Sequence, residues 1–478
     1  MPKVLHVSSE CYPAAKAGGM GDVVGALPLY LPSHNVDASV IIPKYKTKWI
    51  TEQNFKKVHS GKFTIDNKLQ NYTVEVTKDK VLDYPLYFID LPGLFDRSSI
   101  YLGEDGHGYK DEPKRNIAFQ TAVVEWLSEG KSKFDLIHLH DHMTGLIPFF
   151  MQYCPKYAKL KNTPSVLTIH NGMYTGVFEW DEVQSLLPEY QLAHEGLLDW
   201  DNKLNSLSAA IKCGWQVTTV SPSYMKEIVQ ESGTLAPLYN SEADKCTGVL
   251  NGIDSKLWDP STDTNLSYNY DGNWKIFKAK NKAFLEQKFN LIKRRPIIGF
   301  IGRFAYQKGA DLLMDAIMHS LKKKLKFNAV ILGSGDKSLE HDLSNLSSEY
   351  PREVGAYIGY DESLARKIYA GCDFLVMPSR FEPCGLNQLY SMRYGTIPIV
   401  SSKGGLIDTV SDISDDGQGI VIKTLDTDHI IVAIERAINL FKNKKAISHL
   451  IEANGNLDYS WEKSAGLYSE LYFKHLNN

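Results

Sequence analysis

The first segment that could do chemistry is the glycine-rich run S-S-E-C-Y-P-A-A-K-A-G-G-M-G-D at residues 8–22. Gly18, Gly19 and Gly21 allow a close backbone approach, and the helix expected after them would offer free N–H groups to an anion. Lys16 adds a positive charge beside them. The spacing matches neither Gly-x-Gly-x-x-Gly nor a P-loop. The run therefore fits an anion cradle or a plain tight turn with an exposed lysine.

A second segment, L-I-H-L-H-D-H-M-T-G-L, gathers His138, His140, Asp141 and His142 at the end of a hydrophobic run. A metal site is disfavoured, because no matching ligand set follows at zinc-protease spacing and successive strand side chains alternate between the two faces of the sheet, which splits this group. We favour an Asp141 carboxylate that points into a cleft. The alternative is a hydrogen-bonded, partly buried polar cluster.

A polar pair follows another hydrophobic run in S-V-L-T-I-H-N-G-M-Y-T-G. His170 and Asn171 stand where the run stops, and Gly172 begins a turn. Such a pair can hydrogen-bond a hydroxylated ligand. A histidine satisfied within the core remains the alternative.

Two cations follow the run Ile297–Ile301: Arg303 and Lys308 come just before a helix expected to start near residues 309–311. Two positive charges and a helix start at one strand end favour a diphosphate site over ordinary surface cations.

A carboxylate follows the run Phe374–Met377. Glu382 and Cys384 lie in a loop before a helix that opens near Gly385. The carboxylate suits sugar hydroxyls and the backbone amides suit an anion, whereas a helix cap and a buried structural cysteine are the alternative. A further glycine pair, Gly404–Gly405, precedes another helical pattern.

Short hydrophobic runs alternate with helical patterns along the chain, which predicts two doubly wound α/β domains with parallel sheets. We expect the domain boundary near residues 232–251, where both periodicities break. A final helix is indicated by the spacing of Trp461, Ala465, Tyr468 and Tyr472. In open parallel sheets ligands bind beyond the carboxyl ends of the strands, where the segments above lie.

Composition narrows the class of protein. Lys and Arg number 53 against 56 Asp and Glu, a formal net charge of -3, so neither nucleic acid nor an acidic membrane is expected as partner. The six cysteines form no Cys-x-x-Cys pair, which indicates reduced thiols. Without a signal-peptide core or a membrane-length hydrophobic run, we expect a cytoplasmic enzyme.

Several motifs together match a known family. They are Lys16-Ala-Gly-Gly19, Thr168-Ile-His170-Asn171, Val249-Leu-Asn251-Gly-Ile-Asp254, Gly302-Arg303 with Lys308-Gly309, Ser379-Arg-Phe-Glu382-Pro-Cys384-Gly-Leu386, Gly404-Gly-Leu406 and Tyr459-Ser-Trp461. With them the sequence resembles bacterial glycogen synthases and plant starch synthases, which are retaining glucosyltransferases of glycosyltransferase family 5. The resemblance covers essentially the whole chain.

The resemblance implies the GT-B fold, with two doubly wound Rossmann-like domains facing across a cleft. By this carry-over, residues 1–245 form the acceptor-side domain and residues 246–458 bind the nucleotide sugar. Residues 459–478 form a helix that crosses back to the N-terminal domain.

The implied reaction moves glucose from ADP-glucose to the non-reducing 4-hydroxyl of an α-1,4-glucan, with retention, and so elongates glycogen. The implied catalytic residues are Glu382, His170, Arg303 and Lys308. The implied nucleotide-sugar site comprises Lys16, Gly18, Gly19, Asn251, Tyr360, Cys384, Gly385 and Leu386, with the Tyr360 ring against the adenine. Asp141 and Asn171 would face the sugar or the acceptor. No metal and no cofactor is expected.

Three positions depart from the family pattern. Met20 replaces the usual leucine after the glycine pair, and His142 and Met143 replace the usual Trp-His after Asp141. Acceptor handling near Asp141 is therefore open.

Rival functions remain. A nicotinamide-dependent dehydrogenase should show Gly-x-Gly-x-x-Gly after a strand, which this chain lacks. A non-catalytic glucan-binding GT-B protein could dispense with Lys16, Arg303, Lys308 and Glu382, yet all four are present. A phosphorylase of the same fold would need pyridoxal phosphate on a lysine. Within the family, UDP-glucose is the alternative donor.

Overall fold

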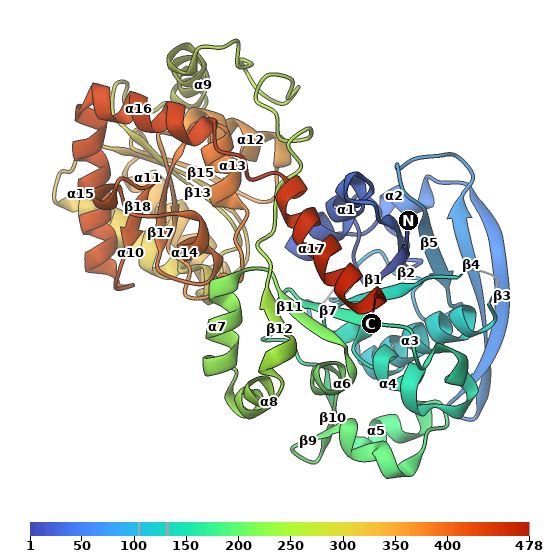
Figure 1. Ribbon diagram of the computed structural model, residues 1–478. Helices are drawn as coiled ribbons and strands as arrows, with labels where there is room; N and C mark the ends of the chain where they lie inside the picture. The colour runs from blue at the N-terminus through green and yellow to red at the C-terminus, as the bar shows by residue number, and fades with distance from the viewer. Residues whose placement is uncertain (104–105, 131–132, 478) are drawn as a thin grey trace. The chain divides into compact units, whose positions relative to one another are not determined.

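The computed structural model describes residues 1–103, 106–130 and 133–477 (Figure 1). The chain forms two compact units, one of Met1–Gly252 with Trp461–Asn478 and the other of Ile253–Ser460. The division differs from the expected boundary after residue 245, because β12 (Cys246–Gly248) pairs in parallel with β11 (Gln216–Thr219) of the first sheet. It also falls after residue 460 rather than 458.

In the described part of the first unit, nine strands form one sheet in the order β12-β11-β7-β6-β1-β2-β5-β4-β3. The bounds of the other strands are β7 Ser165–Ile169, β6 Leu136–His140, β1 Lys3–Val7, β2 Asp37–Pro43, β5 Leu86–Asp90, β4 Lys68–Thr77 and β3 Phe55–Ile65. The strands from β12 to β5 are parallel. β6 and β7 are buried along their whole length, which explains their continuous hydrophobic runs.

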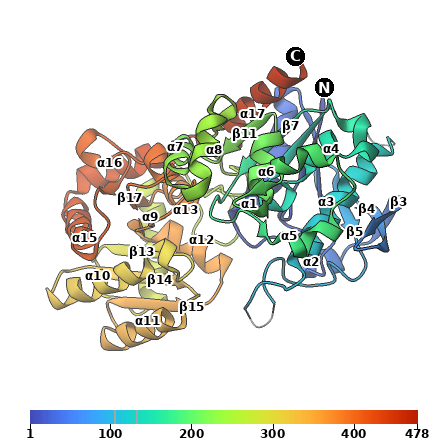
Figure 2. The same cartoon turned by 90° about the horizontal axis from the view of Figure 1, so that it is seen from below.

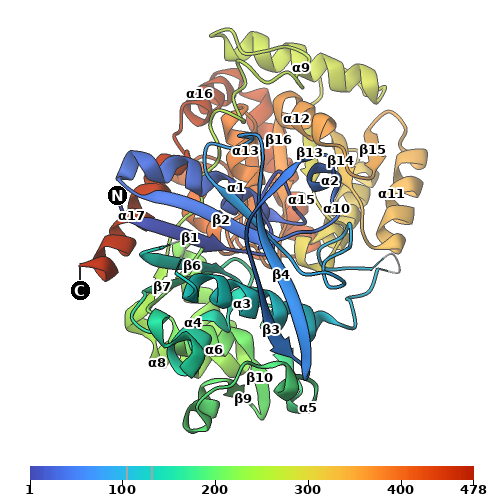
Figure 3. The ribbon, with the colours of Figure 1, turned by 90° about the vertical axis from the view of Figure 1, so that its right-hand side faces the viewer.

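A long antiparallel hairpin, β3–β4, extends the sheet at one edge (Figure 3). The search for hydrophobic runs missed it, because its buried positions alternate with exposed lysines and other polar residues. Asp66 and Asn67, both with positive φ, form its tight turn, as two-residue hairpin loops require. A small sheet of β8 (Val177–Phe178), β10 (Lys203–Asn205) and β9 (Asp199–Trp200) was also not expected.

The helices of the first unit connect its strands, except for α17, which is the last element of the chain. They are α1 Gly19–Tyr30, α2 Lys48–Thr51, α3 Glu112–Ser128, α4 Ile147–Tyr153, α5 Trp180–Val183, α6 Ser206–Cys213, α7 Pro222–Glu231, α8 Ala236–Ser241 and α17 Trp461–Leu476. None of the described helices in either unit is long and apolar enough to span a bilayer.

The second unit is a doubly wound parallel sheet in the order β15-β14-β13-β16-β17-β18. Its strands are β13 Ile297–Ile301, β14 Asn328–Gly333, β15 Val354–Ile358, β16 Phe374–Met377, β17 Ile397–Ser401 and β18 Ile420–Ile422. Its helices are α9 Trp274–Lys288, α10 Ala310–Lys322, α11 Lys337–Glu349, α12 Glu362–Gly371, α13 Asn387–Arg393, α14 Gly405–Thr409, α15 Thr427–Lys442 and α16 Lys444–Gly455. Figure 2 shows α10 and α11 beside the strands β13–β15.

Two hydrophobic clusters cover the two faces of the second sheet. Residues of α10 and α15 pack in one cluster, and residues of α9, α12 and α13 pack in the other. This two-sided burial confirms the doubly wound α/β class predicted from the continuous hydrophobic runs.

The last helix, α17, packs against α1 in the first unit (Figure 1). Trp461, Ala465, Tyr468 and Tyr472 are buried in one cluster with residues of the sheet and α1. The predicted apolar stripe of this helix is thus confirmed. The helix closes the first unit although it lies more than 200 residues further along the chain than β12.

Replacing Trp461 by alanine should destabilise the first unit by about 3–5 kcal/mol, because the side chain is 2% exposed and the cavity cannot refill. Calorimetry should show a lower melting temperature for the transition of this unit. Leu467→Ala is the matched control on the same helix, since Leu467 is 40% exposed and should change stability by less than about 0.5 kcal/mol. Equal effects of the two substitutions would contradict the packing of α17.

Candidate active site

In the parallel part of each sheet the order of the strands reverses once. The reversal lies between β1 and β6 in the first sheet and between β13 and β16 in the second. At such a point the two neighbouring connections leave toward opposite faces and open a crevice beyond the strand ends, where ligands bind in open α/β sheets. The loops after these four strands contain Lys16, Asp141, Arg303 with Lys308, and Glu382. The topology thus places these predicted residues at ligand-binding positions within their own units.

The glycine-rich loop after β1 is organised by Glu10, a residue that the sequence analysis did not select. Its buried Oε2 accepts hydrogen bonds from the backbone N–H groups of Ala17 (2.6 Å) and Gly18 (2.9 Å). Its Oε1 accepts from the Tyr101 hydroxyl at 2.6 Å. A carboxylate of the protein thus occupies the N–H groups of residues 17 and 18, which lie just before the helix whose free N–H groups were expected to hold an anion. The N–H of Gly19 opens helix α1 next to them.

Lys16 is held by an ion pair within the same loop. Its Nζ lies 2.7 Å from Oδ1 of Asp22, and both side chains are about one third exposed. Exposed pairs of this kind contribute about 0–1 kcal/mol, so Lys16 can exchange Asp22 for another anion at little cost.

Asp141, directly after β6, has a backbone conformation that only glycine adopts freely. Its φ is 58° and its ψ is -179°. Such strain costs about 1–3 kcal/mol and persists where the surroundings fix it, often at functional sites. Here Oδ1 accepts hydrogen bonds from the backbone N–H groups of His170 (2.7 Å) and Asn171 (3.3 Å). Burial, opposed by these bonds, raises the pKa of Asp141 to about 7.

His170 and Asn171 follow β7, and the carboxylate of Asp141 brings them together with the neighbouring strand end. The Asn171 Oδ1 accepts from the backbone N–H of Met173 at 3.1 Å, which folds the turn. Burial lowers the pKa of His170 to about 3, so its ring is neutral near pH 7. His170 can therefore donate or accept a hydrogen bond, but it carries no charge under physiological conditions.

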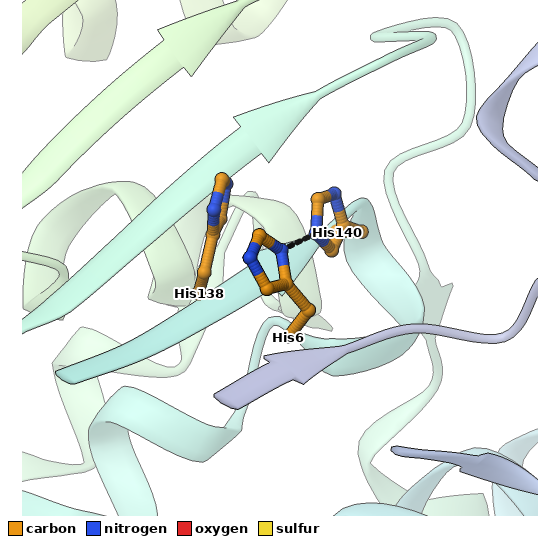
Figure 4. A group of neighbouring side chains, drawn as sticks. All are labelled: His6, His138 and His140. Carbon is orange, nitrogen blue, oxygen red and sulfur yellow. Dashed lines mark hydrogen bonds between the residues drawn. The ribbon is translucent and has the colours of Figure 1, made fainter. Parts of the chain in front are cut away.

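His138 and His140 project from the same face of β6, and the neighbouring strand β1 adds His6 to them (Figure 4). One nitrogen atom from each ring lies within 4.8 Å of the others, so the three could be considered as metal ligands. However, among the described residues, five of their six ring nitrogens already have hydrogen-bond partners, and only His6 Nε2 has none. The group is thus a hydrogen-bonded cluster rather than an open ligand set.

The second ring of this group, His138, connects the sheet to α17. Its Nδ1 lies 2.6 Å from the Tyr472 hydroxyl, and its Nε2 lies 2.7 Å from Thr168 Oγ1. Thr168 in turn contacts the Thr218 hydroxyl at 2.6 Å. His138 therefore belongs to a buried polar layer that holds the last helix.

In the second unit, Lys308 and Glu382 meet at the strand reversal. Lys308 Nζ lies 2.6 Å from Glu382 Oε2, and Ser379 Oγ donates to the same oxygen at 2.8 Å. Glu382 is buried, whereas Arg303 is exposed at the end of β13. The structure thus brings together one cation and the carboxylate that the sequence placed in separate loops. Arg303 is a second positive charge on the same strand connection as Lys308.

The loop from Cys384 to Leu386 leads into α13. Gly385 has φ of 71°, and a Cβ there would lie 2.6 Å from Gln388 Oε1, so the position requires glycine. The Gln388 amide donates to the carbonyl oxygens of Cys384 (3.1 Å) and Gly385 (3.0 Å). This fixes the carbonyls toward Gln388. Cys384 is buried.

Two predicted residues lie apart from these loops. Tyr360 follows β15, is 80% exposed and sits two strands away from β13, with β14 between. Asn251 is buried at the end of the first unit's main segment, and among the described residues its Oδ1 has no hydrogen-bond partner.

A pocket of about 260 Å³ lies in the first unit around the small sheet. Its lining residues include Thr175, Trp200, Asp201 and Lys203. None of the predicted site residues lines it.

Comparison with known proteins defines the class. A family model described as "Starch synthase catalytic domain" matches residues 3–241, and one described as "Glycosyl transferases group 1" matches residues 281–454. Over 99% of each chain the protein also shares its fold with a sucrose-phosphate synthase from Thermosynechococcus elongatus (TM-score 0.63, 17% identity). The two α/β units are therefore those of a glycosyltransferase with the GT-B fold, as the resemblance implied.

Full-length relatives define the family. The chain is 43% identical over 472 residues to a glycogen synthase of Flavobacterium johnsoniae (98% of both chains), and 37% identical over 496 residues to one of Thermosipho africanus (99% of both). The catalytic domain of starch synthase IV from Arabidopsis thaliana, solved with ADP and acarbose, matches over 100% of both chains with a TM-score of 0.89 and 31% identity. The chain belongs to the glycogen and starch synthase family, glycosyltransferase family 5.

The raised pKa of Asp141 leads to a test by Asp141→Asn. An unfolded aspartate has a pKa near 3.9, so between about pH 4 and 7 the folded protein binds more protons at this site and wild-type stability falls as pH rises. The variant lacks this dependence. We expect the stability of the variant relative to the wild type to rise by about 4 kcal/mol between pH 4 and pH 8, because the pKa difference of about three units corresponds to about 1.36 kcal/mol per unit.

Urea unfolding of both proteins at several pH values measures this difference. The buried histidines titrate equally in the two proteins, so their contribution cancels. A stability difference that does not change between pH 4 and 8 would contradict the raised pKa.

Proposed function

We propose that the protein is a retaining glucosyltransferase that moves glucose from ADP-glucose to the non-reducing end of an α-1,4-glucan and so elongates glycogen. Family membership supports the transfer to a glucan, and the ADP and acarbose bound by the Arabidopsis relative support the two substrate classes. The observation that carries the proposal is the Lys308–Glu382 pair at the strand reversal of the second unit, on a connection that also contains Arg303.

The chemistry of the donor explains why these residue types are needed. Breaking the bond between glucose and the diphosphate develops positive charge at the anomeric carbon and negative charge on the leaving oxygen. Arg303 and Lys308 would stabilise the leaving diphosphate. In the first unit, Lys16 and the N–H of Gly19 are the groups that we assign to anion binding. Backbone N–H groups of Cys384, Gly385 and Leu386 are further candidates for donor binding, and we assign the exposed Tyr360 ring to the adenine.

Glu382 is better suited to position the sugar than to attack it. Its carboxylate already accepts from Lys308 and Ser379, which lowers its reactivity and leaves one oxygen for glucose hydroxyls. Retention can follow from attack on the same face of the sugar, with the departing phosphate taking the proton of the acceptor hydroxyl. In this scheme neutral His170, with Asp141, Asn171 and Asn251, hydrogen-bonds the sugar or the acceptor.

A direct test supplies the purified protein with glycogen and either radiolabelled ADP-glucose or radiolabelled UDP-glucose, separately and in competition. We expect label in glycogen and preference for ADP-glucose. Preference for UDP-glucose would overturn the donor assignment, and glycogen binding without incorporation from either donor would identify a non-catalytic glucan-binding protein.

The role of Arg303 can be tested on its own. Arg303→Ala should lower kcat by about 10²–10³, the loss expected when one preorganised charge stabiliser is removed. Because the side chain is exposed, stability should change by less than about 0.5 kcal/mol. Steady-state kinetics with ADP-glucose measures the loss.

Arg352→Ala is the matched control, since Arg352 is an exposed arginine of the same unit away from the strand reversal. It should retain wild-type rates. Similar rates for the Arg303 and Arg352 variants would remove Arg303 from the site.

A further inference from the structure

We propose that His140 is a positioning residue that holds the His170 ring in a single tautomer, and that His6 completes the chain of imidazoles behind it. The importance of this row of imidazoles for catalysis rests on the proposed function, which places His170 at the sugar. The existence of the row rests only on the geometry of the first unit.

The three rings form a continuous row of hydrogen bonds. His6 Nδ1 lies 3.0 Å from His140 Nε2, and His140 Nδ1 lies 2.9 Å from His170 Nε2. Figure 4 shows His6 turned toward His140, with the bond between them drawn as a dashed line. The rings come from three adjacent strands, β1, β6 and the end of β7, so the sheet itself fixes their spacing.

Burial makes the row a chain of neutral rings. It lowers the pKa of His6 and of His170 to about 3, and it holds the pKa of His140 well below its usual range. A neutral imidazole has one nitrogen that donates and one that accepts. Because His140 uses both nitrogens in the row, donating on one side requires accepting on the other.

The proton positions are therefore coupled. If His140 carries its proton on Nδ1, it donates to Nε2 of His170, whose own proton must then be on Nδ1. If His140 carries its proton on Nε2, then His170 must donate from Nε2. All three rings of the row thus carry the proton on the same type of nitrogen, and His170 cannot change tautomer alone.

The far end of the row shows that its role is to fix tautomers, not to conduct protons. Among the described residues His6 Nε2 has no hydrogen-bond partner, and His6 is fully buried. In the part of the chain that the structure describes, no group there can take a proton onward. At the other end, the backbone N–H of His170 donates to Asp141, so main chain and ring are both held.

This coupling matters for the transfer reaction, because the His170 nitrogen that remains for the substrate has a fixed hydrogen-bonding role. It is always a donor or always an acceptor, depending on the proton position that the row adopts. Elsewhere, partners that fix the tautomer and orientation of a functional imidazole have large effects on rate when they are removed.

Nitrogen NMR of the full-length, histidine-labelled protein without substrate tests the chain directly. The His170 signals can be assigned by their loss in His170→Gln. We expect wild-type His140 and His170 each to show one protonated and one unprotonated nitrogen, at the same ring position in both. Opposite ring positions, or averaged signals for His170, would overturn the proposal without any substitution in the row.

Two variants of nearly equal shape separate hydrogen bonding from packing. His140→Asn keeps a polar group at the position of Nδ1, whereas His140→Leu removes it. In the leucine variant the two His170 nitrogen shifts should move toward each other, because the ring exchanges between tautomers, and the asparagine variant should keep the wild-type pattern. An unchanged His170 pattern in His140→Leu would contradict the proposal.

Kinetics provides the second measurement. His140→Leu should lower kcat about 10–100-fold with little change in the KM for the donor, and His140→Asn should recover most of the rate. Equal rates in the two variants would show that His140 acts by packing alone. If the wild type transfers no glucose but the NMR pattern is as expected, the proposed function fails and the tautomer chain stands.

Tyr472→Phe serves as a control for general destabilisation of the buried polar residues. It removes the hydroxyl bonded to His138, which stacks on His140 but is not hydrogen-bonded to it. The variant should lose stability while keeping the His170 nitrogen pattern. A changed pattern in this variant would show that the His170 tautomer reports stability and not the row.

Discussion

The constraint on which the rest of the structure depends is that parallel strands end at a common edge of their sheet. Since every connection must return to the opposite edge, functional loops accumulate at the carboxyl ends, and the reversal of strand order leaves a crevice between two of them. Both units use this position. In the first it places Lys16 and Asp141 on neighbouring connections, and in the second it places Lys308 against Glu382 across 74 residues of sequence.

A second constraint is that a buried polar group must have a partner. The central strands of the first sheet carry histidines and threonines where hydrophobic residues are the rule, and most of them bond another polar group on an adjacent strand or on α17. Tyr472 satisfies His138, and Thr168 bridges it to Thr218. The polar layer thus joins the sheet to the last helix, while the row from His6 to His170 leads to the strand reversal.

Local patterns predicted many of the buried parallel strands, but neither the polar hairpin nor the hydrogen-bond partners of the site residues. The run Ile297–Ile301 coincides with β13, because a strand buried on both faces is hydrophobic throughout. The hairpin β3–β4 was missed, since its outer face is polar. Glu10 and His6 carried no local signal, as their partners lie in other loops or strands. The conformation of Asp141 could not be read from its type, because it is imposed by the amides of residues 170 and 171.

Asp22 and Glu382 are the carboxylates paired with Lys16 and Lys308, and the free energy needed for an incoming anion to displace them differs. Asp22 and Lys16 are both partly exposed, so solvent already weakens their attraction and a diphosphate with more charge can displace Asp22 easily. Glu382 is buried, and separating it from Lys308 would leave a charge with poor solvation. However, Ser379 remains bonded to the same oxygen. Under the proposed function, a diphosphate would therefore be better accommodated by sharing Lys308 than by replacing Glu382, and the carboxylate would stay in place for the sugar while the leaving group is held.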